Sequence, residues 1–146
     1  MTLSNLIFTL LIWISNNTDY QISKFDYSVN VVEKKIIQEK VCNGKCPIIA
    51  YFEPNHGVYI AKGNLEEPCY QSILLHEMIH AFQFNLNKNI ENAFKEMEAY
   101  SLQNLYLNQI SEKKNLLSTL NLKSCRSKQY NTSVSYTHLT LPTMDS

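Results

Sequence analysis

The segment over residues 67–85 constrains the fold most strongly, because it is apolar on almost every side of a predicted helix. Glu66 and Glu67 followed by Pro68 are typical of a helix start, and a polar break begins at Asn85. A helix that is apolar all round is expected to be buried, so other elements must surround it. Its apolar side chains are Ile73, Leu74, Leu75, Met78, Ile79, Ala81, Phe82 and Phe84.

The same helix carries the sequence His76-Glu77-Met78-Ile79-His80. Residues four apart on a helix project from one face, so His76 and His80 can bind one metal ion, with Zn–N distances of about 2.0–2.1 Å. Glu77 then lies beside the metal and can act as a general base. The alternative is a plain core helix whose histidines form internal hydrogen bonds. We favour the metal, because buried histidines and a buried glutamate need partners.

Catalytic zinc sites usually have three protein ligands and a water molecule, so a third ligand is required. The next predicted helix offers Glu91, Glu96 and Glu98. Positions two apart on a helix cannot face the same ion equally well, so Glu96 and Glu98 are alternatives.

The HExxH helix followed by Glu-Met-Glu-Ala-Tyr at residues 96–100 resembles the gluzincins, in which a glutamate of an ExxA pattern is the third ligand. The resemblance implies a zinc-dependent peptidase in which His76, His80 and Glu96 bind Zn²⁺ and Glu77 is catalytic. Over residues 41–107 the chain also resembles small uncharacterised bacterial metallopeptidase-like proteins. It has no third-histidine extension, no Met-turn and no NExxSD sequence, which argues against metzincins and thermolysin-like enzymes.

The rest of the pattern predicts an α+β, zincin-like domain. We expect a first helix over residues 29–42, then an antiparallel β-hairpin from residues 47–53 and 58–61, with the solvated His56 in its turn. A second long helix should run to about Ile110, antiparallel to the HExxH helix. In zincins a strand before the HExxH helix often lies along the substrate, so residues 48–52 or 58–61 are expected to bind peptide. Tyrosines that could polarise a peptide carbonyl are Tyr51, Tyr59 and Tyr100.

The chain ends predict segments outside this domain. Residues 6–14 form an apolar run too short to span a bilayer, which suits a signal-peptide core, although no lysine or arginine precedes it and no small-residue cleavage site follows. A buried N-terminal helix or strand is the alternative. We assign residues 1–27 to the signal-like segment and linker, 28–122 to the metallopeptidase domain and 123–146 to a disordered tail. Residues 134–139 match a translated sequencing adapter, so roughly the last dozen residues are expected to be non-native, and His138 is excluded.

Composition narrows the function class further. The chain has 146 residues, 45% of them hydrophobic and 18% charged, with a formal net charge of zero, which argues against a nucleic-acid partner. Four cysteines allow two disulfides in three pairings, which suits a secreted or periplasmic protein. We therefore predict a zinc peptidase with a peptide or protein substrate and no membrane span after signal removal. The alternative is a non-catalytic, zinc-stabilised module that binds a protein or peptide.

Overall fold

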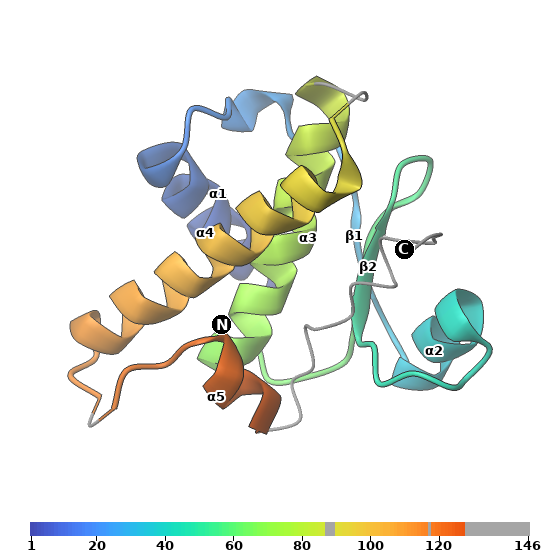
Figure 1. Cartoon of the computed structure of the whole chain (residues 1–146). Helices are drawn as coiled ribbons and strands as arrows, with labels where there is room; N and C mark the ends of the chain where they lie inside the picture. The colour runs from blue at the N-terminus through green and yellow to red at the C-terminus, as the bar shows by residue number, and fades with distance from the viewer. Residues whose placement is uncertain (87–89, 117, 128–146) are drawn as a thin grey trace.

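The computed structural model describes residues 1–86, 90–116 and 118–127, and it confirms an α+β fold (Figure 1). A three-stranded sheet lies on one side of the long helix α3, and helices α1 and α4 lie on the other side. The elements are α1 (Leu3–Asn17), the 3-10 helix η1 (Ile22–Lys24), β1 (Val29–Val32), α2 (Lys34–Cys42), β2 (Ala50–Glu53), β3 (Gly57–Ala61), α3 (Pro68–Leu86), α4 (Asn92–Lys113) and α5 (Leu122–Ser127).

The sheet has the order β1-β3-β2. The predicted hairpin is confirmed, because β2 pairs antiparallel with β3 and Tyr51 lies opposite Tyr59. The predicted first helix is wrong over residues 29–32, which form β1, parallel to β3, and a helix begins only at Lys34. Valines are stiff at χ1 and favour strands, so pairing with β3 overrides the apparent helical spacing.

One glycine lets β1 and β3 approach each other. Gly57 has a φ of +105°, and a Cβ atom there would collide with the backbone of Ser28. The Val58 amide donates a hydrogen bond to the Ser28 carbonyl at 2.9 Å across the same junction. A residue other than glycine at this position would be strained in φ and would push the two strands apart.

Helix α3 is the centre of the molecule, and every residue from 69 to 83 is buried. Gln83 near the end of α3 contacts Lys95 near the start of α4. Gln71 near the start of α3 contacts Tyr106 in the second half of α4. This progression confirms that α3 and α4 are antiparallel. Ala99, on the α4 face towards the core, is fully buried, and its small side chain allows close approach of the helices.

The apolar N-terminal run forms α1 and belongs to the core. Leu6, Leu10 and Ile14 recur at helical spacing and are fully buried, and the Trp13 indole donates to Gln109 of α4 at 2.8 Å. The structure therefore has the buried N-terminal helix that was the alternative to a signal segment, and ordered structure begins before residue 28. Removal of the signal-like segment stays a prediction. No helix among the described residues is long and apolar enough to cross a membrane.

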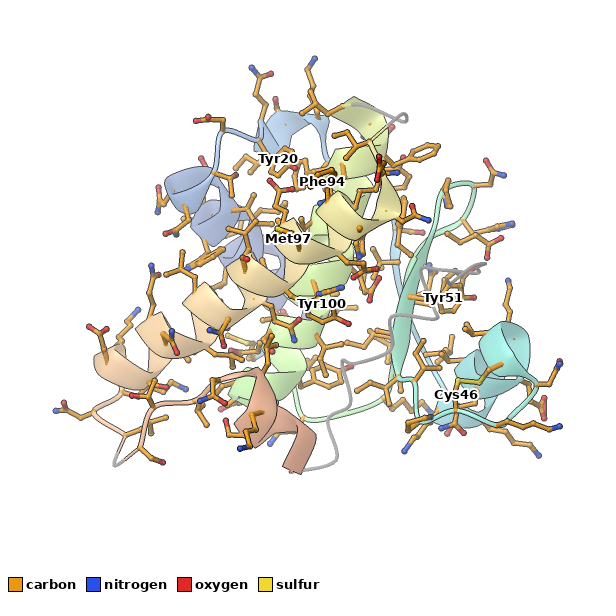
Figure 2. All side chains as sticks on the ribbon, viewed as in Figure 1. Tyr20, Cys46, Tyr51, Phe94, Met97 and Tyr100 are labelled. Carbon is orange, nitrogen blue, oxygen red and sulfur yellow. A yellow bond between two sulfur atoms is a disulfide. The ribbon has the colours of Figure 1, made fainter. Side chains whose placement is uncertain are left out.

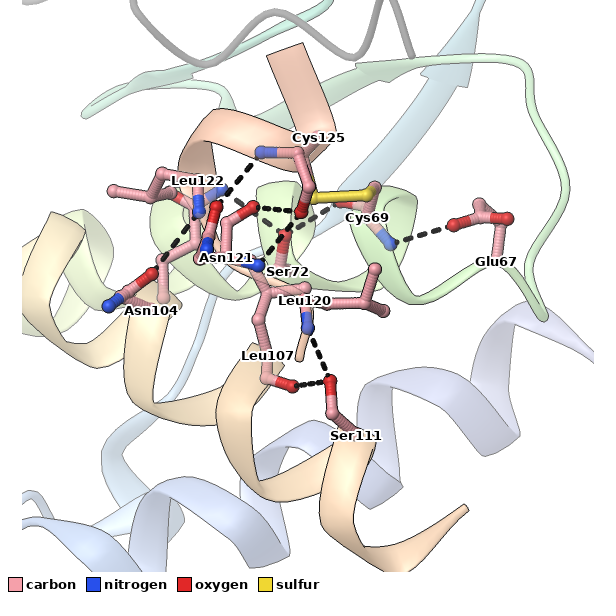
Figure 3. Close-up of a disulfide and its surroundings, with 12 residues drawn as sticks. Glu67, Cys69, Ser72, Asn104, Leu107, Ser111, Leu120, Asn121, Leu122 and Cys125 are labelled. Carbon is pink, nitrogen blue, oxygen red and sulfur yellow. Dashed lines mark hydrogen bonds between the residues drawn. A yellow bond between two sulfur atoms is a disulfide. The ribbon is translucent and has the colours of Figure 1, made fainter. Parts of the chain in front are cut away.

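Two disulfides select one of the three pairings, Cys42 with Cys46 and Cys69 with Cys125. The second joins the start of α3 to α5, where Leu107 and Leu120 form a small core with the two cysteines (Figure 3). The prediction of a disordered tail from residue 123 is therefore wrong up to residue 127, because α5 is held by this bond. Residues 128–146, with His138 and the adapter-like sequence, lie outside the described residues.

Removing the disulfide between Cys69 and Cys125 is expected to destabilise the protein more than removing the other one. The disulfide between Cys69 and Cys125 joins residues 56 apart in the sequence, whereas the one between Cys42 and Cys46 joins residues only 4 apart. Loop-closure entropy predicts losses of about 4 and about 2 kcal/mol for the respective double Cys→Ser variants. Denaturant unfolding measures both free energies. The reverse order, or equal losses, would contradict the role given to α5.

Candidate metal centre

Three buried side chains converge where α3 and α4 cross. The Nε2 atom of His76 lies 3.1 Å from Nε2 of His80 and 3.1 Å from Oε1 of Glu96, and His80 Nε2 lies 3.3 Å from Glu96 Oε2. These atoms all lie within 4.8 Å of one another. The group could hold a metal ion, and it contains the three residues that the sequence predicts as ligands.

Glu96 and not Glu98 meets the histidines. Glu98 projects from another face of α4 and accepts hydrogen bonds from the Tyr20 hydroxyl and the Gln83 amide. Glu91 is the exposed residue that precedes α4 and is not in the group. The geometry therefore separates the three glutamates that the sequence alone left as alternatives.

The ring of His76 is oriented by Gln103. Its Nδ1 lies 2.9 Å from Gln103 Oε1, and the Gln103 amide nitrogen lies 3.2 Å from the Ser72 hydroxyl oxygen. The Ser72 hydroxyl donates to the Cys69 carbonyl, so it accepts from Gln103. The Gln103 oxygen then faces His76, which places the imidazole proton on Nδ1 and turns Nε2 towards Glu96 and His80.

The ring of His80 is oriented in the same way by Gln83. Its Nδ1 lies 2.8 Å from Gln83 Oε1. The Gln83 amide nitrogen donates to the Lys95 carbonyl at 2.9 Å and to Glu98 Oε1 at 2.8 Å, and both of these groups can only accept. The Gln83 oxygen therefore faces His80, which carries its proton on Nδ1 and turns the Nε2 lone pair towards Glu96.

Two imidazole nitrogens and a carboxylate converge in this buried site, and a bound cation would offset the cost of burying them. Without a bound metal ion the pKa of His80 is raised: burial acts to lower it, but the hydrogen bond and charge of Glu96, the charge of Glu77 and the hydrogen bond to Gln83 outweigh burial. A single proton can be shared by only two of the three groups, which are His76 Nε2, His80 Nε2 and the Glu96 carboxylate. A divalent metal ion can bind all three. The imidazole and carboxylate donors are those that such an ion uses.

Glu77 and Tyr100 lie beside the three ligands. Glu77 is buried, and its charge is close enough to help raise the pKa of His80. The Tyr100 ring packs on the His76 ring, with 4.5 Å between their centroids. Tyr51 and Tyr59 instead stack on each other in the sheet, near Lys40 of α2. Figure 2 shows Tyr51 at the sheet and Tyr100 on α4. Of the three tyrosines singled out in the sequence, Tyr100 alone contacts a ligand residue in the described structure.

A pocket of about 190 Å³ reaches the site. Its walls come from β2 and the residue that follows it, the second half of α3 and the start of α4. The lining residues are Phe52, Pro54, His80, Phe84, Asn92, Lys95 and Glu96. Because β3 is the central strand, residues 58–61 have neighbours on both sides, and peptide binding by strand addition there is ruled out. Within the described chain β2 is an edge strand, so peptide binding by residues 48–52 stays a prediction.

Sequence reasoning missed the groups that orient the ligands. Gln83 follows His80 by three residues on the same helix, and Gln103 follows Glu96 by seven, which is about two helical turns. Both spacings place an amide on the ligand-bearing face and could have indicated this role. Tyr20 gave no such signal, since it is connected to Gln83 only through a hydrogen bond to Glu98 that forms on folding.

Comparison with protein families places the chain in a family defined by sequence. The profile described as Domain of unknown function (DUF6647) matches residues 1–130. The chain belongs to this family. The match covers α1 and α5 as well as the metal-binding group, so the DUF6647 domain extends beyond the predicted range of 28–122 at both ends. No curated protein and no solved structure matches the chain.

Proposed function

We propose that the protein is a zinc-dependent peptidase in which His76, His80 and Glu96 bind the metal and Glu77 is the general base. The observation that carries this proposal is the convergence of two Nε2 lone pairs and one carboxylate beside a second buried carboxylate. The resemblance to gluzincins points to the same assignment. We further propose a secreted or periplasmic location, which the two disulfides favour.

Zinc suits this donor set better than the other common metals. Two imidazoles and one carboxylate make up a frequent catalytic zinc site, whereas Ca²⁺ and Mg²⁺ prefer oxygen ligands alone. All four cysteines are in disulfides, so no thiolate competes for the ion. Three protein ligands leave a coordination position for water.

The chain's own residues supply the remaining chemistry. Bound zinc would make the attacking water acidic, with a pKa of about 7, and would polarise the peptide carbonyl. Glu77 takes the proton that the water loses as its oxygen bonds to the carbonyl carbon. It then passes the proton to the leaving amine nitrogen as the C–N bond breaks. Gln83 and Gln103 hold the two Nδ1 atoms, so both Nε2 atoms would face a bound ion.

The substrate is proposed to be a peptide or a protein segment in extended conformation. β2 is an edge strand, and Phe52 on this strand also lines the pocket with His80 and Glu96. A peptide paired with β2 would use backbone hydrogen bonds and pass along the mouth of that pocket. This arrangement would give low sequence specificity, because backbone pairing does not depend on side chains.

The second candidate function is a zinc-stabilised module that binds a peptide without cleaving it. The small pocket favours it, since about 190 Å³ is below the range of about 300–1,000 Å³ typical of small-molecule sites. Against it stands Glu77, because a structural zinc site needs no carboxylate next to the open coordination position.

A cleavage assay with unstructured protein tests the proposal. We expect the purified chain to cleave casein, to lose this activity when a chelator removes the metal, and to regain it with about one equivalent of zinc. Recovery with zinc but not with magnesium would support the assigned donor set. A chain that binds zinc and cleaves nothing would favour the binding module instead.

A further inference from the structure

We propose that Tyr20, Glu98 and Gln83 are positioning residues that hold His80 in its metal-binding tautomer. The segment between α1 and β1, which contains Tyr20, would then help to orient a metal ligand and would not be a mere linker. This inference rests on the metal site of the proposed function. It adds which residues outside the ligand set determine the metal affinity.

The three residues form a continuous chain of hydrogen bonds. The Tyr20 hydroxyl donates to Glu98 Oε1 at 2.5 Å, and the same oxygen accepts from the Gln83 amide at 2.8 Å. The other end of the Gln83 amide meets His80 Nδ1 at 2.8 Å. Each member fixes the orientation of the next, from the N-terminal segment to the ligand.

Tyr20 is held firmly enough to act as the outer end of this chain. Its ring stacks on Phe82 with 5.2 Å between centroids, and Phe82 precedes Gln83 on α3. The pKa of Tyr20 is raised by burial and by the adjacent Glu98, so its hydroxyl keeps its proton and stays a donor. Glu98 is therefore fixed by donors from two separate segments.

His76 is oriented by a different hydrogen-bond chain. The amide that orients His76 belongs to Gln103, and that chain ends within α3 at Ser72 and the Cys69 carbonyl. The His80 chain instead reaches a surface cavity of about 560 Å³, which Tyr20 and Glu98 line together with residues 17–19 and Asn85. Docking of the N-terminal segment thus acts on His80 through this hydrogen-bond chain.

The test measures zinc affinity by competition with a chromophoric chelator, and the imidazole ¹⁵N shifts of His80 in the metal-free chain. Gln83→Leu is expected to weaken zinc binding about 10- to 100-fold and to mix the two His80 tautomers. Glu98→Ala should act in the same direction. Tyr20→Phe, which keeps the ring stacking, should have a smaller effect in that direction.

Two further variants separate positioning from general destabilisation. Exchanging the pair, Gln83→Glu with Glu98→Gln, keeps an acceptor for His80 Nδ1 and a donor between the two side chains but loses the donor to the Lys95 carbonyl, so it should recover part of the affinity that Gln83→Leu loses. Tyr27→Phe removes a hydroxyl that donates to Asn85 and is not part of the hydrogen-bond chain from Tyr20 to His80. It should leave the zinc affinity and the His80 tautomer unchanged.

The outcomes distinguish this inference from the proposed function. Tyr20→Phe and Glu98→Ala with wild-type affinity and a wild-type His80 tautomer would overturn the inference. So would a loss in Tyr27→Phe equal to that in Tyr20→Phe. If zinc binds and no peptide is cleaved, the peptidase fails while the positioning role stands. If no zinc binds, the metal site fails, and the tautomer shifts in the metal-free chain still decide on the hydrogen-bond chain.

Discussion

Replacing Glu96 by glutamine is expected to abolish tight zinc binding. The Glu96 carboxylate supplies the only negative charge among the three converging ligands, and it faces both Nε2 lone pairs at 3.1 and 3.3 Å. A glutamine amide offers a neutral oxygen and can turn an N–H group towards the histidines. The loss in affinity should exceed the roughly 100-fold upper cost of removing a hydrogen-bond partner of a ligand. Competition titration with a chromophoric chelator measures it.

Glu98→Gln is the matched control for this experiment, because Glu98 lies on the same helix two residues away. Its amide oxygen can still accept from Gln83, so affinity should fall far less than in Glu96→Gln. Equal losses in the two variants would mean that charge near the site matters and direct ligation by Glu96 does not. A Glu96→Gln protein with wild-type affinity would remove Glu96 from the ligand set.

Replacing Glu77 by glutamine is expected to abolish peptide cleavage while zinc stays bound. Glu77 is buried beside the ligands but is not one of the three converging groups. A glutamine has nearly the same shape and cannot accept the proton of the attacking water. Loss of a general base typically lowers the rate by about 10²- to 10⁴-fold. Measurements of kcat/KM on a fluorogenic peptide, with zinc content determined on the same sample, check both parts.

The control for Glu77→Gln is Glu66→Gln, in which an equal charge is removed from a side chain that is 70% exposed. That variant should keep both cleavage and zinc. Undiminished cleavage in Glu77→Gln would refute its role as the base. Loss of zinc together with cleavage would indicate that Glu77 holds the site together and has no separate catalytic part.

The ligand set could be predicted from the sequence because its geometry is mostly local. The spacing of His76 and His80 fixes their common face on any helix, and Glu96 needed only an antiparallel second helix. The spacings of Gln83 and Gln103 carried a similar local signal, whereas Tyr20, at the outer end of the hydrogen-bond chain to His80, could not be predicted in this way. Tyr20 lies 78 residues from its partner Glu98, and no periodic pattern links them.

The fold was predicted less well at the edges than at the centre. Residues 29–32 have the spacing of a helix and form a strand, because pairing with β3 outweighs that spacing. The apolar residues of α1 fit both a signal segment, which the sequence favoured, and a core helix, and in the structure they belong to the core. α5 depends on the disulfide of Cys125, whose partner the sequence could not identify.

The central claim is tested most directly by X-ray absorption spectroscopy of the zinc-loaded wild-type chain. We expect one zinc per chain, with two imidazole nitrogens at about 2.0–2.1 Å, further oxygen ligands at about 2.0–2.2 Å and no sulfur. The imidazole contribution should fall by half in His80→Ala. A chain that retains no zinc, or a spectrum without two imidazoles, would contradict the assignment of His76, His80 and Glu96 as a metal centre.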